Sequence, residues 1–422
     1  MKGPALIPEH LPDRLTICLW DFSWYTQAGP GQPYSDLGVA LDETAARGYN
    51  TIRICAAPLL LFGGLGLDDL ATALAVEGLG ATPGGGYFGR RTRWYNTAGG
   101  FQVPVRERLF ELLAGARERG LSVILSTWEY QQSTAFAADR RWFDAIETVP
   151  ITARFEALAA AFDLMLNEIH LAGLDDVVAF VELHNEVDFS RVPGLGAEAV
   201  DAVGTLRAAH PGQQVTVSLG KPPHVAMHTV PAGLDVGQFH VYSYGVLDAL
   251  QRQVEIRESG SADFPNAMLH SLQRAGSPSV AEYGRPADWK LEATVITDQM
   301  LYGYDTVDPD RWDAWLYENY GSYRALMYRE VASRVKAAAR WGAWRGVPVV
   351  IGEGWVGYTP LEAGFEEGPA GKALAEHGMR TARSEGVWGV ATCSNAAPHH
   401  PMWADVVWQR RVNDEFRDPD PA

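Results

Sequence analysis

The sequence predicts an α/β protein, a (β/α)8 TIM barrel with long insertions after the second and sixth strands. Short apolar segments alternate with segments of helical period from one end of the chain to the other. Eight of the apolar segments are strand candidates, and eight parallel strands close such a barrel. Several helical segments also end at glycine or asparagine directly before the next strand, as at 47–50, which is common helix-capping chemistry. Repetition of this unit favours a barrel over a doubly wound sheet.

The expected strands are short and apolar at consecutive positions. Strands of this kind are buried on both faces, which a parallel sheet wrapped by helices requires. The segments are 15–20, 50–55, 121–127, 177–183, 214–219, 237–242, 347–351 and 387–393.

The expected helices lie between most of these strands. Their apolar residues recur at the helical period, so each would cover the barrel with one apolar face. The segments are 36–47, 104–119, 152–172, 197–209, 323–343, 371–384 and 402–416.

Two segments are too long for the minimal repeat, and both are rich in aromatic residues. They are 58–100, which is also rich in glycine, and 247–321. Each follows the carboxyl end of a strand, where long loops usually shape a substrate site. Each could instead be a surface excursion with its own aromatic core. No linker rich in serine and proline divides the chain, so we expect one catalytic domain over 1–422.

Composition narrows the possible partners. The chain has 422 residues, of which 47% are hydrophobic and 21% charged, so it can bury a large core. Its net charge of -17 argues against nucleic acid and anionic membranes as partners, because polyphosphates would be repelled. A neutral carbohydrate is compatible with this charge. A homodimer is possible through aromatic-rich loops such as 312–323.

The amino-terminal segment and the cysteines favour a cytoplasmic location. Residues 1–14 contain three prolines and no apolar run of the kind that a secretion signal needs. No segment is long and apolar enough to cross a bilayer. Cys18, Cys55 and Cys393 are odd in number and lie in expected strands, so we interpret them as small buried residues in a reducing compartment.

Two glutamates are the strongest functional signal. Glu186 follows the apolar segment 177–183, and Glu353 follows the apolar segment 347–351. A parallel barrel presents its functional side chains at the carboxyl ends of its strands. Two acids on different strands are therefore expected to meet at one end of the barrel, as the carboxyl pair of a glycosidase does.

The strand ends as a group resemble those of clan A glycoside hydrolases, and most closely glycoside hydrolase family 5, the cellulase-like family. The resemblance covers roughly the whole chain, with four short motifs in the family's order. They are NTIR at 50–53, HNE at 184–186, FHVY at 239–242 and IGE at 351–353.

The resemblance implies a role for each matching residue. Glu186 would be the general acid/base and Glu353 the nucleophile, while Asn185 would bind the substrate 2-hydroxyl. Arg53 and Tyr242 would orient Glu353 and keep it ionised.

The resemblance also places His240 in the site, near the acid/base. A retaining mechanism of this kind would use no cofactor and no metal ion.

Two strand ends depart from the family pattern. The histidine usual after the third strand is missing from 126–130, where Trp128 stands, and the tryptophan usual after the eighth strand is missing from 392–395. Trp355 or Trp20 could supply the stacking face for a sugar ring instead. These departures leave the mechanism in place but put the substrate in doubt.

The principal candidates also have structural interpretations. Glu186 and Glu353 could be carboxylates at helix N termini, favoured there by the helix dipole. Arg53 could be a buried ion-pair partner inside the barrel, and His240 a hydrogen-bonded core histidine.

The remaining polar strand ends are ambiguous. Glu129, Asp21 and Asn395 could bind sugar hydroxyls or serve only the structure. His399 and His400 invite a metal interpretation, but no third ligand is evident at helical spacing.

The sequence therefore predicts a retaining glycoside hydrolase that cleaves a β-linked glycoside or short oligosaccharide, with exo action favoured by the two long insertions. The alternative is an inactive carbohydrate-binding protein on a cellulase-like barrel.

Overall fold

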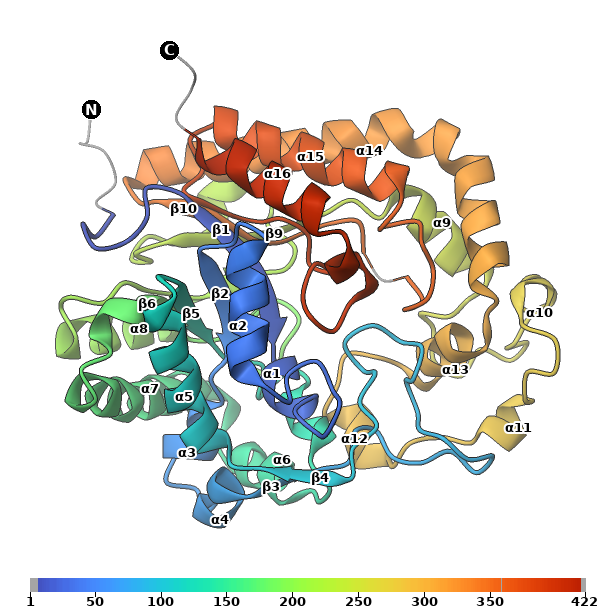
Figure 1. Cartoon of the computed structure of the whole chain (residues 1–422), viewed down its shortest axis with the longest axis horizontal. Helices are drawn as coiled ribbons and strands as arrows, with labels where there is room; N and C mark the ends of the chain where they lie inside the picture. Colours follow the sequence, from blue (N-terminus) through green and yellow to red (C-terminus); the bar gives the residue numbers. More distant parts are fainter. Residues whose placement is uncertain (1–6, 358, 419–422) are drawn as a thin grey trace.

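A computed structural model describes residues 7–357 and 359–418, and within them the strands form a closed parallel barrel (Figure 1). The strand order is β7-β6-β5-β2-β1-β11-β10-β9-β8. All eight predicted strands are confirmed, with ends shifted by a few residues. The barrel strands are β1 (Leu15–Asp21), β2 (Thr51–Cys55), β5 (Ser122–Ser126), β6 (Val178–Glu182), β7 (Val215–Thr216), β8 (Ser218–Leu219), β9 (Gly237–Tyr242), β10 (Val349–Trp355) and β11 (Gly389–Ala391).

The fifth barrel strand is interrupted at one residue, which explains why nine strands fill eight positions. β7 pairs with β6, β8 pairs with β9, and Val217 alone separates them. The interrupted strand therefore lies between β6 and β9 and closes the barrel there. The strands are buried along almost their whole length, as their apolar sequences predict.

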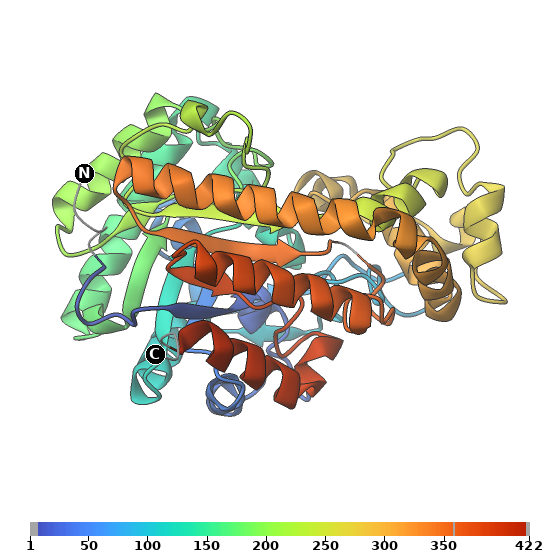
Figure 2. The ribbon, with the colours of Figure 1, turned by 90° about the horizontal axis from the view of Figure 1, so that it is seen from above.

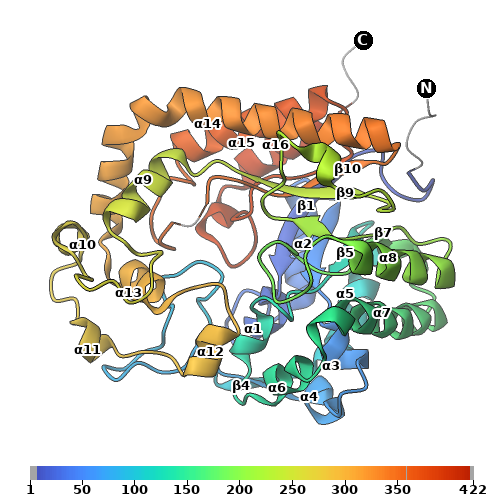
Figure 3. The same cartoon turned by 180° about the vertical axis from the view of Figure 1, so that it is seen from behind.

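The seven predicted helices are confirmed, and they surround the barrel. In Figures 1 and 2, α14, α15 and α16 lie side by side over one flank, and α7 and α8 cover another in Figure 3. Between β8 and β9 the described chain forms only a 3-10 helix, η4 (Met227–Thr229). The covering helices are α2 (Leu37–Ala46), α5 (Val105–Glu118), α7 (Arg154–Leu171), α8 (Ala197–Ala209), α14 (Pro309–Arg345), α15 (Pro369–Ser384) and α16 (Val406–Arg417).

Short helices and turns connect these elements at the two ends of the barrel. They are α1 (Ser23–Thr26), η1 (Ser133–Phe136), α6 (Arg141–Glu147), η2 (Ile151–Ala153), η3 (Asp175–Val177) and η5 (Pro401–Ala404).

The two insertions lie at the end of the barrel opposite the described chain ends (Figure 2). The first pairs two short strands in an antiparallel ribbon, and the second is a series of short helices that leads into α14. Their elements are α3 (Pro58–Phe62), α4 (Asp68–Thr72), β3 (Leu74–Val76) and β4 (Phe101–Val103), then α9 (Gly245–Gln253), α10 (Ala267–Leu272), α11 (Val280–Tyr283), α12 (Asp288–Glu292) and α13 (Asp298–Thr306).

Buried polar contacts fix the two insertions to each other. The Asp305 carboxylate accepts hydrogen bonds from the amides of Gly89 and Arg91 and from the hydroxyls of Thr92 and Tyr283. A buried carboxylate with four donors is well satisfied, so this junction is specific in geometry.

The segment 312–323, expected to be an exposed aromatic loop, is instead part of α14. The helix begins at Pro309, where the Asp308 carboxylate accepts from the amides of Asp310 and Arg311. Trp312 is completely buried, so it is not available to a partner chain.

None of the helices among the described residues combines the length and the hydropathy needed to cross a lipid bilayer. Residues 1–6, which form part of the amino-terminal segment 1–14, lie outside the described residues.

Candidate active site

A cavity of about 740 Å³ opens at the carboxyl ends of the strands, where the insertions rise over the barrel. Its volume is within the usual range for small-molecule sites. Both predicted catalytic residues line it. Polar and charged residues of the wall include Asp21, Gln131, Gln132, Asn185, Glu186, Lys221, Asp248, Arg252, Arg257, Glu330, Arg334 and Glu353; apolar and aromatic ones include Phe22, Trp94, Trp128, Phe189, Tyr242, Tyr244, Val295, Met300, Tyr323 and Leu326.

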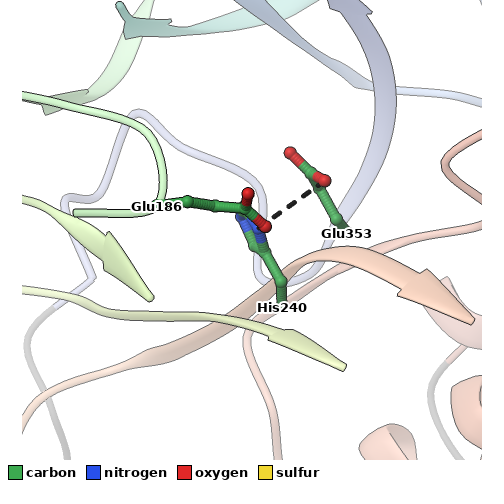
Figure 4. Close-up of side chains that lie close together, drawn as sticks. All are labelled: Glu186, His240 and Glu353. Atoms are coloured by element: carbon green, nitrogen blue, oxygen red, sulfur yellow. Dashed lines mark hydrogen bonds and ion pairs between the residues drawn. The ribbon is translucent and has the colours of Figure 1, made fainter. Parts of the chain in front are cut away.

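Glu186 and Glu353 meet across this cavity although 167 positions separate them (353 − 186). Glu353 lies near the carboxyl end of strand β10, and Glu186 follows β6 by four positions. One oxygen of each carboxylate and one nitrogen of His240 all lie within 4.8 Å of one another (Figure 4). A separation of this size is that of a carboxyl pair that can act on one bond from two sides.

Glu353 is surrounded by hydrogen-bond donors. Arg53 Nη1 lies 2.8 Å from its Oε1, Tyr242 Oη donates to its Oε2 at 2.7 Å, and His240 Nδ1 is 3.6 Å from the same oxygen. Burial acts to raise the pKa of Glu353, but His240, Arg53 and Tyr242 outweigh it and hold this pKa below its usual value. The side chain is therefore kept ionised, as a nucleophile must be.

A chain of hydroxyl groups orients the Tyr242 proton. Ser394 Oγ accepts from the amide of Gly354 at 3.0 Å and lies 2.8 Å from Tyr242 Oη. Because the single Tyr242 proton points to Glu353, the Ser394 hydroxyl has to donate to Tyr242. Aligned hydrogen bonds of this kind strengthen one another, so Ser394 helps to position Glu353 without touching it.

Glu186 is in a different environment. Its Oε1 is 2.8 Å from His240 Nδ1, and its Oε2 accepts from Gln131 Nε2 at 3.0 Å. Burial raises the pKa of Glu186 above its usual value, and the nearby Glu353 charge raises it further, while His240 acts in the opposite direction. The environments of the two glutamates therefore push their pKa values apart, which is typical of an acid and a nucleophile in one site.

His240 is shared between the two acids. Burial lowers the pKa of His240, but the charges of Glu353 and Glu186 outweigh burial and raise it above its usual value. The three groups therefore form one proton-sharing unit, whose titration steps belong to the unit and not to one residue.

A buried polar layer lies directly beneath the pair. Arg53, from β2, makes two hydrogen bonds to Glu182 of β6 at 2.8 and 2.7 Å, and another to Asn185 Oδ1 at 2.5 Å. Gln238, from β9, donates to the same Glu182 carboxylate at 2.6 Å. These contacts cross the barrel between strands that are not neighbours. Arg53 is thus an internal ion-pair residue and a Glu353 ligand at once.

The helix-dipole interpretation of the two glutamates is wrong. Glu353 lies within a strand, and the next helix, α15, begins at Pro369. Glu186 is followed by an irregular segment, and α8 begins only at Ala197. Neither carboxylate is near enough to a helix N terminus to be held there by the dipole, whose effect fades within one turn.

Asn185 and Tyr242 line the cavity, as the resemblance implies. Asn185 Nδ2 donates to Gln131 Oε1 at 2.6 Å, which leaves its second N–H for another acceptor. Trp128 also lines the cavity, and the Arg53 guanidinium lies 4.6 Å from the centre of its ring.

Glu129 lies outside the cavity wall and serves the structure. Its carboxylate accepts from the amides of Leu59 and Leu60, from Trp142 Nε1 and from the Thr127 hydroxyl. Burial raises its pKa to about 7 in spite of these donors. The side chain anchors helix α3 and is not oriented toward a sugar.

Trp355, Trp20 and Asn395 are also buried outside the cavity wall. Trp355 Nε1 donates to the Thr392 carbonyl, and its ring packs directly against Gly378 of α15. Trp20 packs edge-on against Tyr34. The proposed stacking role of these two tryptophans is therefore wrong, because helices and loops cover both rings.

One group of possible metal ligands is present among the described residues, and it is the same trio of Glu186, His240 and Glu353. All four carboxylate oxygens of the trio already accept a hydrogen bond, from His240, Gln131, Arg53 or Tyr242. The Arg53 cation also opposes a second cation beside Glu353. This donor set suits an acid pair better than a metal ion.

Several residues of the site were not found from the sequence. Glu182 carried a usable signal, because a charge inside a doubly buried strand needs a partner, as does Arg53. Gln131, Gln238 and Ser394 carried none, since such residues are common in loops and strands.

Comparisons with known proteins agree with the fold and with the resemblance. A family model described as "Cellulase-like: Sugar-binding cellulase-like" matches residues 17–193. The structure is similar to that of a proposed glycoside hydrolase from Parabacteroides distasonis, with a TM-score of 0.64 and 20% identity over 97% of this chain and 95% of the other. This similarity confirms the TIM barrel.

Two further structures are less similar to this one. One is the endo-β-1,4-mannanase from Thermotoga petrophila, with a TM-score of 0.49 and 13% identity over 97% of this chain and 78% of the other. The other is a glycoside hydrolase family 5 mannosidase from Rhizomucor miehei, with a TM-score of 0.45 and 12% identity over 96% and 94%. No curated protein matches the chain.

Proposed function

We propose that this protein is a retaining glycoside hydrolase acting on a β-linked glycoside or short oligosaccharide. The observation that carries the proposal is that one carboxylate oxygen of Glu186 and one of Glu353 lie within 4.8 Å of each other, in one cavity whose environment separates the pKa values of the two glutamates. Inverting enzymes need a wider gap, because a water molecule has to fit between the acid and the base.

The mechanism assigns one role to each acid. Glu353, ionised, attacks the anomeric carbon, while Glu186 gives its proton to the leaving oxygen, so that the glycosidic bond breaks as the glycosyl ester forms. Glu186, now ionised, then takes a proton from a water molecule, which attacks the same carbon and releases Glu353. The two steps together consume one water molecule and return both glutamates to their starting protonation states, so no cofactor is needed.

The surrounding residues prepare these steps. Arg53 and Tyr242 hold both oxygens of Glu353 in place, and His240 stands between the two acids. Asn185 lines the cavity and has one side-chain N–H left for the substrate 2-hydroxyl. Preorganised donors of this kind need no rearrangement during the reaction.

A reducing compartment such as the cytoplasm is part of the proposal. Cys18, Cys55 and Cys393 are all unpaired and buried. Short imported glycosides would be suitable substrates there.

The test begins with a panel of aryl β-glycosides and short β-linked oligosaccharides. Glu353→Ala is expected to stop turnover, and azide or formate should restore part of it with inverted anomeric configuration, because the small anion replaces the missing nucleophile. Glu186→Ala should slow substrates with poor leaving groups far more than activated aryl glycosides, since only the former need the proton.

A matched control is Glu385→Ala, which removes a half-buried glutamate at the C-cap of α15, away from the cavity wall. If both active-site variants keep the wild-type rate on an unactivated substrate, the assignment is wrong. If no glycoside is cleaved while sugars raise the melting temperature, the protein is a carbohydrate-binding protein on a catalytic scaffold.

A further inference from the structure

Glu186 is held in place by three segments that are far apart in the sequence. Its Oε1 lies 2.8 Å from His240 Nδ1 (Figure 4), and its Oε2 accepts from Gln131 Nε2 at 3.0 Å. Its amide donates to the Ser218 hydroxyl at 2.9 Å, and Gly220, two positions further along, lines the cavity beside the carboxylate. These contacts decide where the carboxyl group lies and which of its oxygens can carry a proton.

The orientation of the Gln131 amide is determined by a chain of hydrogen bonds that begins at Arg53. A guanidinium group has donors and no acceptor, so the Asn185 atom that Arg53 Nη2 contacts at 2.5 Å has to be the oxygen. The Asn185 nitrogen then donates to Gln131 Oε1 at 2.6 Å, which leaves the Gln131 nitrogen to face Glu186 Oε2. Both amides are only 1% exposed. Gln131 is therefore a donor to Glu186 and not an acceptor.

The two carboxylate oxygens of Glu186 are consequently not equivalent. A proton on Oε2 would face the Gln131 N–H at 3.0 Å, and two donors in contact repel each other. The Oε1 contact has no such restriction, because the imidazole nitrogen of His240 can accept or donate according to its protonation state. The protonated form of Glu186 therefore carries its proton on Oε1.

Gly220 provides the space that this carboxylate occupies. A Cβ atom at position 220 would lie 2.4 Å from Glu186 Oε1, 2.5 Å from Cδ and 2.9 Å from Cγ, closer than real Cβ atoms come to other atoms. The segment is fixed there, because the amides of Gly220 and Lys221 both donate to the Asp188 carboxylate at 2.8 Å. The φ of Gly220 is not in the left-handed region, so the requirement for glycine comes from the approach of Glu186.

We infer that Gln131 and Gly220 are positioning residues for the acid/base of this site: Gln131 keeps Oε2 of Glu186 an acceptor, so that Oε1 carries the transferred proton, and Gly220 leaves room for the carboxylate. Both residues act through Glu186 and take no part in the bonds that form or break. The inference rests on the proposed glycosidase function, in which Glu186 gives its proton to the leaving oxygen.

The first test replaces Gln131 by glutamate and by methionine. Glutamate still accepts from Asn185 but offers Glu186 Oε2 an acceptor in place of a donor, while methionine fills the space without an N–H. Both remove a hydrogen bond that favours the ionised form of Glu186, so the pKa of Glu186 rises and its protonated form persists to higher pH. The basic limb of the kcat/KM profile should move up by about one pH unit with methionine and further with glutamate.

This shift reports the Gln131 contact, because the other titratable groups around Glu186 are kept in both variants. A purely structural defect would instead lower kcat/KM by the same factor at every pH. The groups that are kept are His240, Tyr242, Tyr244, Glu353 and Asp188.

The second test is Gly220→Ala. It should lower kcat/KM about 100-fold or more on an unactivated oligosaccharide and less than about tenfold on an activated aryl glycoside, since only the former needs the proton of Glu186. In a Glu186→Ala background the same substitution should have no further effect, because the added methyl group meets no carboxylate. Gly204→Ala is the matched control: it lies in α8, where an added Cβ meets no other segment within 4 Å, and it should leave every rate unchanged.

A measurement without turnover separates failure of this inference from failure of the proposed function. The labelled carboxyl carbon of Glu186 can be titrated by NMR and assigned by its loss in Glu186→Gln, and Gln131→Glu should raise the midpoint of its titration. If the midpoint and the basic limb are unmoved in both Gln131 variants, or if Gly220→Ala costs as much without the Glu186 carboxylate as with it, the inference is wrong. If the wild type cleaves no glycoside while the midpoint still moves, the proposed function is wrong and the positioning of Glu186 stands.

Discussion

Replacing Tyr242 by phenylalanine tests how the structure keeps Glu353 ionised. The substitution removes the 2.7 Å hydrogen bond to Glu353 Oε2 and leaves Arg53 in contact with Oε1. The ring can stay where it is, next to Tyr244 at 6.0 Å. A hydrogen bond to a charged group contributes about 1.5–3 kcal/mol, so kcat/KM should fall about 10- to 150-fold where the bond matters most.

The pH dependence makes this prediction specific. Tyr242 is one of the groups that hold the pKa of Glu353 below its usual value. Without it that pKa rises, so a larger fraction of Glu353 is protonated and inactive in mild acid. The acidic limb of the kcat/KM profile should therefore move to higher pH, and the loss should be greater at pH 5 than at pH 7.

The assay is the initial rate on an aryl glycoside from about pH 4 to pH 8. Ser394→Ala should show the same shift to a smaller extent, because the Ser394 hydroxyl bonds to the Tyr242 hydroxyl and not to the Glu353 carboxylate itself. Tyr244→Phe is the matched control, since the Tyr244 hydroxyl makes no hydrogen bond to either glutamate. A Tyr242→Phe profile with an unmoved acidic limb would refute the conclusion that the Tyr242 hydroxyl helps to keep Glu353 ionised.

Three further predictions follow from the buried charges. Arg53→Met should lower the free energy of unfolding by about 3–5 kcal/mol in denaturant titrations, because it leaves Glu182 and Glu353 buried without their cation, and adding Glu182→Gln should recover part of it. Burial raises the pKa of Glu366 from 4.5 to about 8. The contribution of this carboxyl group to the free energy of unfolding is therefore present below about pH 4.5 and lost as the pH rises through about 8. Glu366→Gln should flatten the dependence of the free energy of unfolding on pH over this range. Asp305→Asn should make the first insertion more sensitive to limited proteolysis while the far-UV circular dichroism of the barrel is retained, and unchanged proteolysis would show that the junction is not held by this carboxylate.

The barrel could be predicted from the sequence because its elements obey local rules. Each strand is buried on both faces and each covering helix on one, so hydrophobic periodicity finds them. The start of α14 was misplaced by fourteen positions, from Pro309 to Tyr323 (323 − 309), because its first turns pack against aromatic residues from other segments, such as Tyr304 and Phe365. The sequence did carry a start signal there, an aspartate at N-cap and a proline at N1.

The catalytic pair could be predicted for a different reason. A parallel barrel brings all carboxyl ends of its strands to one place, so identifying the strands is enough to bring Glu186 and Glu353 together. Which aromatic residue lines the cavity depends instead on how the insertions fold over the barrel. Trp20 and Trp355 are next to strands and yet buried under other elements, while Trp94 reaches the cavity from a segment without regular structure.

Backbone conformation gives a second reason why local rules fail at this site. Five non-glycine residues of the described chain have φ between 43° and 64°, and three of them, Asp21, Trp94 and Glu186, line the cavity. Such residues are strained and persist only where surrounding contacts fix them. For Glu186 those contacts include the Ser218 hydroxyl on its amide and the Ser190 hydroxyl on its carbonyl, at 2.9 Å each. Asp21, Trp94 and Glu186 line the same cavity, so the strained backbone positions are concentrated at the candidate site, where they cannot be found from local sequence rules.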